Sequence, residues 1–354
     1  MSDHPGASRH PSRSRRGAVS GLSPLAGRTS RPYNRANFQQ VPERRLMIFN
    51  FARHFFCMAL VVFAFTASGL DPAMGAPAHI EKNVVYGMVS GTALLLDVYY
   101  PVKPNGYGIV FVPGSGWQAA SAYGEVPLNM RPSVEHYGGS FVDAGYTVFV
   151  PNHRAAPMFV YPAAVKDIER AVRFIRYNAI RFGIRPDRIG GSGTSSGGHL
   201  MALMALRDGL GNPEDGDPVN RESAKIQCFA AQAPTTDFLN PEYKSPNLPV
   251  FMGFAPDEAH AAVLREASPI TYISRDDPPF LMVHGDRDAL VPFAESMAME
   301  NALRRKGVPV KLVRVAGGTH SFNFGEVAHP PDYRAEMIAW FDRYLKNAPT
   351  TKRQ

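Results

Sequence analysis

The stretch Arg188-Ile-Gly-Gly-Ser-Gly-Thr-Ser-Ser-Gly-Gly-His-Leu200 decides the fold of this chain. Its centre, Gly193-Thr-Ser195-Ser-Gly197, has the pattern Gly-x-Ser-x-Gly between an apolar approach and a helical run. A turn that passes directly from strand to helix is so tight that side chains two positions either side of the serine would collide, which explains both glycines. Such a turn strains the serine backbone and projects its oxygen above the helix N-terminus. The context favours Ser195 as a nucleophile over a plain tight turn.

Apolar runs and helical patterns alternate on both sides of this turn. Strands are predicted at residues 84–89, 93–99, 108–112, 146–150, 188–191, 227–232, 280–284 and 310–315. Helices are predicted at 133–144, 162–182, 198–206, 292–306 and 333–346. Strands separated by helices form a mainly parallel sheet that is covered on both faces. We therefore expect one α/β domain with eight strands, the first two paired as a hairpin.

A serine hydroxyl needs a base to take its proton and an acid to orient that base. Because strand carboxyl ends line the site in open α/β sheets, both partners should follow strands. Asp288 follows the predicted strand 280–284, and His320 follows the strand 310–315. The order Ser195, Asp288, His320 is typical of α/β-hydrolases. Asp286 is the rival acid, but its position in a Gly-Asp turn favours a role in bracing that turn.

The oxyanion formed during acyl transfer needs N–H donors. One should be the N–H of Ser196, and others should come from the loop after the strand 108–112. This loop reads Pro113-Gly114-Ser115-Gly116-Trp117, so we expect donors at Gly114, Ser115 or Gly116. Trp117 is expected to contact the substrate.

The formal charge of the 354-residue chain is +7, and it belongs entirely to the N-terminal part. Residues 1–78 contain ten arginines and three acidic residues, whereas the remainder contains 28 basic and 28 acidic residues. A balanced body argues against a nucleic-acid partner. Cys57 and Cys228 are the only cysteines, so no disulfide is expected within the processed chain. Cys228 lies in an apolar run and is expected to be buried.

The N-terminal part has the pattern of an export signal. Residues 1–46 are rich in Arg and Ser without apolar periodicity and are expected to be disordered. Residues 47–78 contain an apolar core after basic residues and end Ala76-Pro77-Ala78, which predicts a signal peptide. The start is either Met47, which we favour, or Met1 with a twin-arginine-type signal. We expect a secreted or periplasmic protein, or one that an uncleaved N-terminal segment anchors to a membrane.

Several further segments carry a family resemblance. They are Leu96-Asp-Val-Tyr99, Pro113-Gly-Ser-Gly-Trp117, Tyr161-Pro-Ala-Ala-Val-Lys-Asp167, Ala267-Ser-Pro-Ile270 and His284-Gly-Asp-Arg-Asp-Ala-Leu-Val-Pro292. With the serine turn and Gly318-Thr-His320, they resemble the α/β-hydrolase superfamily. The resemblance is greatest to the bifunctional feruloyl and acetyl-xylan esterase-like carboxylesterases. It implies the α/β-hydrolase fold over residues 79–348 and ester hydrolysis through an acyl-enzyme, without metal or cofactor.

The chain departs from these relatives at two places. Their oxyanion loop usually reads His-Gly-Gly-Gly-Trp, whereas Pro113 and Ser115 stand here for the histidine and one glycine. Asn152-His153-Arg154 stands where relatives have Asp-Tyr-Arg. The backbone donors are expected to survive both changes, so the changes bear on substrate preference.

Residues 238–277 are longer than a plain connection and predict a small cap over the site. Phe251, Met252 and Phe254 could line an acyl pocket there or pack against the core. The expected substrates are small acyl or carbohydrate-linked esters. A peptidase or amidase with the same three residues, and an inactive hydrolase fold used for binding, remain the alternatives.

Overall fold

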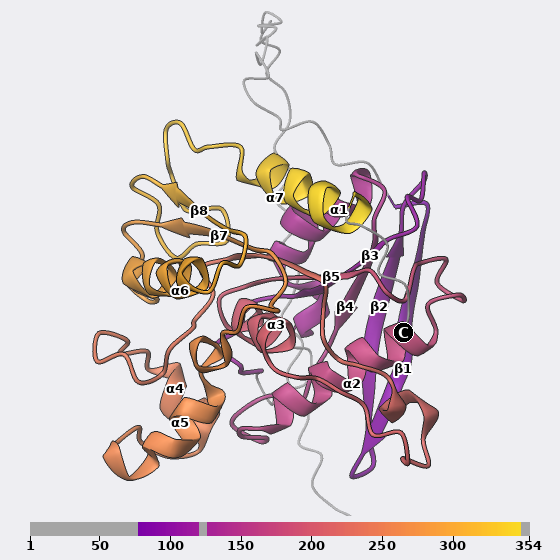
Figure 1. The fold of residues 1–354 in the computed structure, drawn as a ribbon, viewed down its shortest axis with the longest axis horizontal. Helices are drawn as coiled ribbons and strands as arrows, with labels where there is room; N and C mark the ends of the chain where they lie inside the picture. The colour runs from indigo at the N-terminus through magenta and orange to yellow at the C-terminus, as the bar shows by residue number, and fades with distance from the viewer. Residues whose placement is uncertain (1–76, 120–125, 348–354) are drawn as a thin grey trace, which may run out of the picture. The chain divides into compact units, whose positions relative to one another are not determined.

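A computed structural model describes residues 77–119 and 126–347. The predicted leader (1–46) and nearly all of the predicted signal segment (47–78) lie outside these residues. An eight-stranded sheet with the order β1-β2-β4-β3-β5-β6-β7-β8 organises the described chain (Figure 1). Its strands are β1 His79–Val89, β2 Thr92–Tyr100, β3 Gly108–Val112, β4 Thr147–Pro151, β5 Ile189–Thr194, β6 Cys228–Gln232, β7 Phe280–Gly285 and β8 Val310–Val315.

The sheet is mainly parallel, as the alternation of apolar runs and helices predicts. Strands β3 to β8 pair in parallel, whereas β2 is antiparallel to both β1 and β4. The prediction starts β1 at residue 84, but the strand begins at His79. A register irregularity between Glu81 and Val84 breaks the two-residue alternation there, which hides the first part of the strand from a pattern search.

Helices cover both faces of the sheet, because successive residues of each buried strand point to opposite sides. Val110 and Val112 of β3 belong to one hydrophobic cluster with α2 (Ala163–Tyr177), α3 (Ser196–Leu206) and α6 (Phe293–Arg305). Ile109 and Phe111 belong to the other, with α1 (Ser140–Asp143) and α7 (Tyr333–Phe341). Figure 1 shows α1 beside α7 and away from α2. The predicted α/β-hydrolase architecture is confirmed.

Two helices differ from their predicted bounds. Helix α2 ends at Tyr177, before the predicted residue 182. Asn178 leaves the helical conformation (φ −95°, ψ 16°), and the next N–H, that of Ala179, donates to Arg176 O as in a turn. The segment predicted as the helix 133–144 begins as a π-helix, Val134–Gly139, and continues as α1. Cys228 is buried, as expected for a small hydrophobe.

Residues 238–277 contain the short helices α4 (Asn247–Met252) and α5 (Ala261–Ala267). A buried carboxylate holds the start of this segment to α6. Glu295 Oε2 accepts hydrogen bonds from Thr236 N (3.0 Å) and Asp237 N (2.9 Å), and Oε1 accepts one from Asn240 Nδ2 (2.6 Å). Phe251 and Met252 are buried in the larger hydrophobic cluster, so of the two predicted roles they take the core-packing one.

Candidate active site

Ser195 lies at the junction of β5 and α3 with the strained backbone that its pattern predicts. Its φ and ψ angles are 51° and −121°, in a region that non-glycine residues rarely adopt. Position 197, which flanks the serine, requires glycine because the backbone of Val112 passes close to it. A Cβ at Gly197 would lie 1.9 Å from Val112 O. The serine N–H donates to Gln232 O at 2.9 Å, which ties the turn to β6.

Three side chains from different strand ends form one hydrogen-bonded chain. His320 Nε2 lies 2.9 Å from Ser195 Oγ, and His320 Nδ1 lies 2.6 Å from Asp288 Oδ2. An ionised carboxylate only accepts, so Nδ1 carries the proton and Nε2 accepts from the serine hydroxyl. The structure therefore brings the three residues together in the arrangement of a base between a nucleophile and an acid.

The Asp288 carboxylate is buried and kept ionised by its donors. Oδ1 accepts from Leu290 N at 2.9 Å and from Val291 N at 2.8 Å. Burial acts to raise the pKa of Asp288, but hydrogen bonds from His284, His320 and Val291 outweigh it and hold the pKa well below its usual range. A permanently ionised acid keeps His320 in the tautomer that can accept the serine proton.

Asp286, the rival acid, is held elsewhere. Its Oδ2 accepts from Arg314 Nε at 2.7 Å, and its Oδ1 accepts from Gly317 N at 2.7 Å. The carboxylate thus joins the turn after β7 to the turn after β8. This position agrees with the bracing role that its Gly-Asp context suggests.

The oxyanion loop differs in part from its prediction. The Gly114 N–H donates to Thr194 Oγ1 at 2.7 Å, and the Ser115 N–H donates to Ser196 Oγ at 2.9 Å. Two of the predicted donors are therefore already used to fasten the loop to the serine turn. The Gly116 N–H has no acceptor among the described residues, and Ser196 begins α3, where helix N–H groups lack intrahelical partners.

Trp117 does not reach the cavity beside Ser195, contrary to the prediction of a substrate contact. It is 1% exposed, and its ring stacks on Phe251 at a centroid distance of 4.5 Å. Its Nε1 donates to His199 Nδ1 at 3.0 Å, and His199 Nε2 lies 2.8 Å from Ala267 O. Burial lowers the pKa of His199 to about 4, so the ring is neutral and matches both partners. His199 therefore has a structural role and fixes Trp117 at the end of the loop.

The cavity beside Ser195 has a volume of about 310 Å³, near the lower end of the range for small-molecule sites. Its walls come from Gly114, Ser115, Gly116, Arg131, Pro132, Ser133, Thr194, Ser195, Gln232, Asn247, Leu290, His320 and Phe322. Arg131 and Asn247 were not identified from the sequence, because each lies in a connection without apolar periodicity or a recognisable motif.

The described residues contain no group of three or more His, Cys, Asp or Glu side chains that could hold a metal ion. No helix in the described part of the chain is long and apolar enough to cross a bilayer.

Known proteins similar to this chain include esterases. It is 28% identical over 236 residues to esterase LipQ of Mycobacterium tuberculosis, covering 65% of this chain and 52% of the relative. It is 24% identical over 298 residues to an acetylxylan esterase of Xylanibacter ruminicola, covering 79% of this chain and 54% of that protein. The chain spans about half to just under two thirds of the length of three curated relatives that it matches.

Two solved structures resemble this chain over nearly their whole length. A truncated carbohydrate esterase from gut microbiota is 25% identical with a TM-score of 0.65, covering 78% of this chain and 99% of that one. An acetyl ester-xyloside bifunctional hydrolase from Caldicellulosiruptor lactoaceticus is 25% identical with a TM-score of 0.61, covering 78% and 98%. The sequence profile named BD-FAE matches residues 96–303, which is more than half of the chain. This chain belongs to the BD-FAE family of α/β-hydrolases, in agreement with the resemblance that its motifs indicate.

Proposed function

We propose that this protein hydrolyses carboxylic esters through an acyl-enzyme intermediate. The observation that carries the proposal is the hydrogen-bonded chain from Ser195 through His320 to Asp288, with distances of 2.9 and 2.6 Å. The names of the similar proteins, which include esterases and a carbohydrate esterase, support ester bonds as the target.

Each residue of the chain has a separate part in the reaction. His320 Nε2 takes the proton of Ser195 while Oγ attacks the ester carbonyl carbon. Asp288 stabilises the imidazolium that forms. The N–H groups of Ser196 and Gly116 donate to the developing oxyanion. His320 then protonates the leaving alcohol, and a water activated by the same nitrogen releases the acid and restores Ser195.

Esters with a small acyl group or a carbohydrate alcohol are the proposed substrates. The volume of about 310 Å³ beside Ser195 suits a small acyl group or a single sugar unit. The similarity to an acetylxylan esterase and to a carbohydrate esterase supports the same class.

Replacing the nucleophile tests the proposal. Wild-type protein should hydrolyse p-nitrophenyl acetate or butyrate, and Ser195→Ala should lose about a thousandfold or more of kcat. A fluorophosphonate probe should label the wild type and not the variant. Hydrolysis by Ser195→Ala at the wild-type rate would refute the nucleophile. Cleavage of amides with no cleavage of esters would favour a peptidase or amidase, and absence of labelling would favour an inactive binding protein.

We also propose export, followed by removal of the N-terminal segment near Pro77 or His79. The charged, apolar and Ala-x-Ala pattern of residues 47–78 supports this. Cleavage there would leave the sheet whole, because β1 begins at His79. Mass spectrometry of protein from its native host should find the new N-terminus. An intact residue 1–76 segment in a cytosolic fraction would contradict export.

A further inference from the structure

Two residues that line the cavity beside Ser195 carry a buried polar atom without a hydrogen-bond partner among the described residues. In residues 77–119 and 126–347, three buried side-chain nitrogen or oxygen atoms lack a hydrogen-bond partner: Ser115 Oγ, Arg131 Nε and Trp340 Nε1. Two of these three residues, Ser115 and Arg131, line this one cavity. A buried donor without an acceptor costs free energy, so the wall of the cavity is incompletely satisfied at both residues. These two atoms are closed to solvent, whereas the terminal nitrogens of Arg131 are not closed in this way and have no hydrogen bond to the described residues, so they are the ones that a molecule in the cavity can reach.

The guanidinium of Arg131 also has no counter-ion within residues 77–119 and 126–347. No carboxylate in the described part of the chain forms an ion pair with it. Arg131 also lines a second cavity, whose lining includes Asp97 and Glu135. Asp97 accepts from Asn83 N and Asn129 Nδ2, and Glu135 is exposed. Because arginine does not lose its proton in proteins, Arg131 is a permanent cation in the cavity wall.

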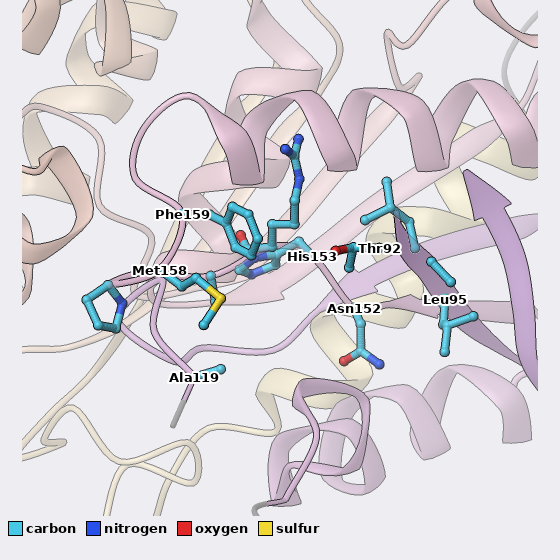
Figure 2. Close-up of a pocket in the computed structure, with 12 residues that line it drawn as sticks. Thr92, Leu95, Ala119, Asn152, His153, Met158 and Phe159 are labelled. Carbon is cyan, nitrogen blue, oxygen red and sulfur yellow. The ribbon is translucent and has the colours of Figure 1, made fainter. Parts of the chain in front are cut away.

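Arg154 is an arginine with a structural role, and its hydrogen bonds can be compared with those of Arg131. It lies at a separate hollow of about 500 Å³ whose walls include His153 and Phe159 (Figure 2). Its Nε and Nη2 both donate to the buried carboxylate of Asp167, at 3.0 and 2.7 Å. Arg154 is therefore satisfied within the fold, whereas Arg131 is not.

The charge of the cavity favours an anion. Among the residues that line it, Arg131 is the one permanent charge, and none is a carboxylate. Asp288 lies behind His320 and is not part of the lining. A small cavity with one fixed cation attracts anions and raises their local concentration. The loop that carries Arg131 is held in place, since the Arg131 N–H donates to Leu128 O (3.3 Å) and Val134 N–H donates to Arg131 O (2.9 Å).

We propose that Arg131 binds a carboxylate of the substrate, so that this protein prefers esters that carry an anionic group. Suitable compounds are half-esters of dicarboxylic acids and acetylated uronic acids, which place the carboxylate on the acyl or the alcohol side. The inference rests on the proposed ester hydrolysis and names its substrate class. Arginine suits this role because its planar fork donates two parallel hydrogen bonds to a carboxylate.

Matched substrate pairs test the inference. p-Nitrophenyl hemiglutarate is compared with p-nitrophenyl valerate, and acetylated galacturonate with acetylated galactose. The ratio of kcat/KM for the charged ester to that for the neutral ester should favour the charged ester in at least one pair. Arg131→Gln should lower this ratio by about 10- to 100-fold, the value of one or two charge-assisted hydrogen bonds. Arg131→Lys should give a ratio between those of Arg131→Gln and the wild type, and added salt should reduce the wild-type ratio.

Arg305→Gln, which removes an exposed arginine on α6, is the control and should leave the ratio unchanged. The inference is overturned if the wild type hydrolyses esters with no preference for charge, or if Arg131→Gln keeps the wild-type ratio. If the wild type hydrolyses no ester, the proposed function fails separately. Calorimetric binding of glutarate or galacturonate to Ser195→Ala then decides, because binding that needs Arg131 supports the inference and its absence refutes it.

Discussion

His284 Nε2 lies 3.2 Å from Asp288 Oδ2, the same oxygen that faces His320 Nδ1 at 2.6 Å. The Nε2 atom also lies 3.0 Å from Val291 O. Since both neighbours only accept, Nε2 carries a proton and donates to them. The other ring nitrogen, Nδ1, lies 2.7 Å from Ser296 Oγ on α6. The proposed catalytic acid is thus held between two histidines, one of them completely buried behind it.

Replacing His284 should impair catalysis more than binding. His284→Phe removes one donor to Asp288 while Leu290 and Val291 still hold the other oxygen, so the carboxylate is held less firmly. We expect kcat to fall by about 10- to 100-fold, as for a lost hydrogen bond to a charged group, with KM changed little. Ser296→Ala keeps the contact of His284 Nε2 with Asp288 and should lower kcat less. Steady-state kinetics with thermal unfolding checks this, and an equal rise in KM would point to a collapsed cavity instead.

Substitutions at the two aspartates of the turn after β7 should have very different effects on kcat. Asp288→Asn cannot hold His320 in the accepting tautomer and should lose about 10⁴-fold in kcat, as a serine hydrolase does when its acid is amidated. Asp286→Asn lies outside the hydrogen-bonded chain and should keep activity within about tenfold, with some loss of stability from its contacts to Arg314 and Gly317. Comparable losses in the two variants would argue against Asp288 as the acid.

The sequence predicts which strand-end residues the structure brings together, because each depends on local signals. Ser195 lies in a turn whose glycines are required by a nearby backbone oxygen. Asp288 follows β7, which is buried throughout, and His320 follows β8, where Lys and Arg interrupt the apolar residues and only Val315 is buried. The order of these three residues along the chain can be recognised without knowing how the chain packs. The same locality explains why the sheet and the helices that cover it are predictable.

Features that depend on tertiary contacts are not predictable in this way. The N–H of Gly114 has an acceptor because Thr194, far along the chain, presents its hydroxyl there. Trp117 turns inward because His199 and Phe251 form a site for its ring. Arg131 follows no periodic segment, and its proposed role rests on the hydrogen-bond partner that its Nε lacks among the described residues. Such properties depend on how segments distant in sequence pack together.

Gly197 should tolerate no side chain. The Cβ of Gly197→Ala would lie 1.9 Å from Val112 O and 2.5 Å from Val112 C, and a backbone in the centre of the sheet cannot move aside cheaply. We expect a loss of about 3 kcal/mol or more in the free energy of unfolding, at or above the usual cost of overpacking. In Gly216→Ala the new Cβ meets nothing within 4 Å, so the change should be within about 0.5 kcal/mol. Urea unfolding measures both, and equal stabilities would contradict the close approach of β3 to the serine turn.

His199 should make stability depend on pH in the mildly acidic range. Burial lowers its pKa to about 4 in the folded protein, whereas an unfolded histidine has a pKa of about 6.5. Between these values the unfolded state binds a proton that the folded state does not, so the stabilising contribution is complete above about pH 6.5 and is lost as pH falls towards 4. Relative to His199→Gln, which can still accept from Trp117 and donate to Ala267, the wild type should lose up to about 1.4 kcal/mol per pH unit in this window. Urea unfolding of both proteins at a series of pH values checks this. Parallel curves would mean that the ring is protonated in the folded protein and that Trp117 is held in another way.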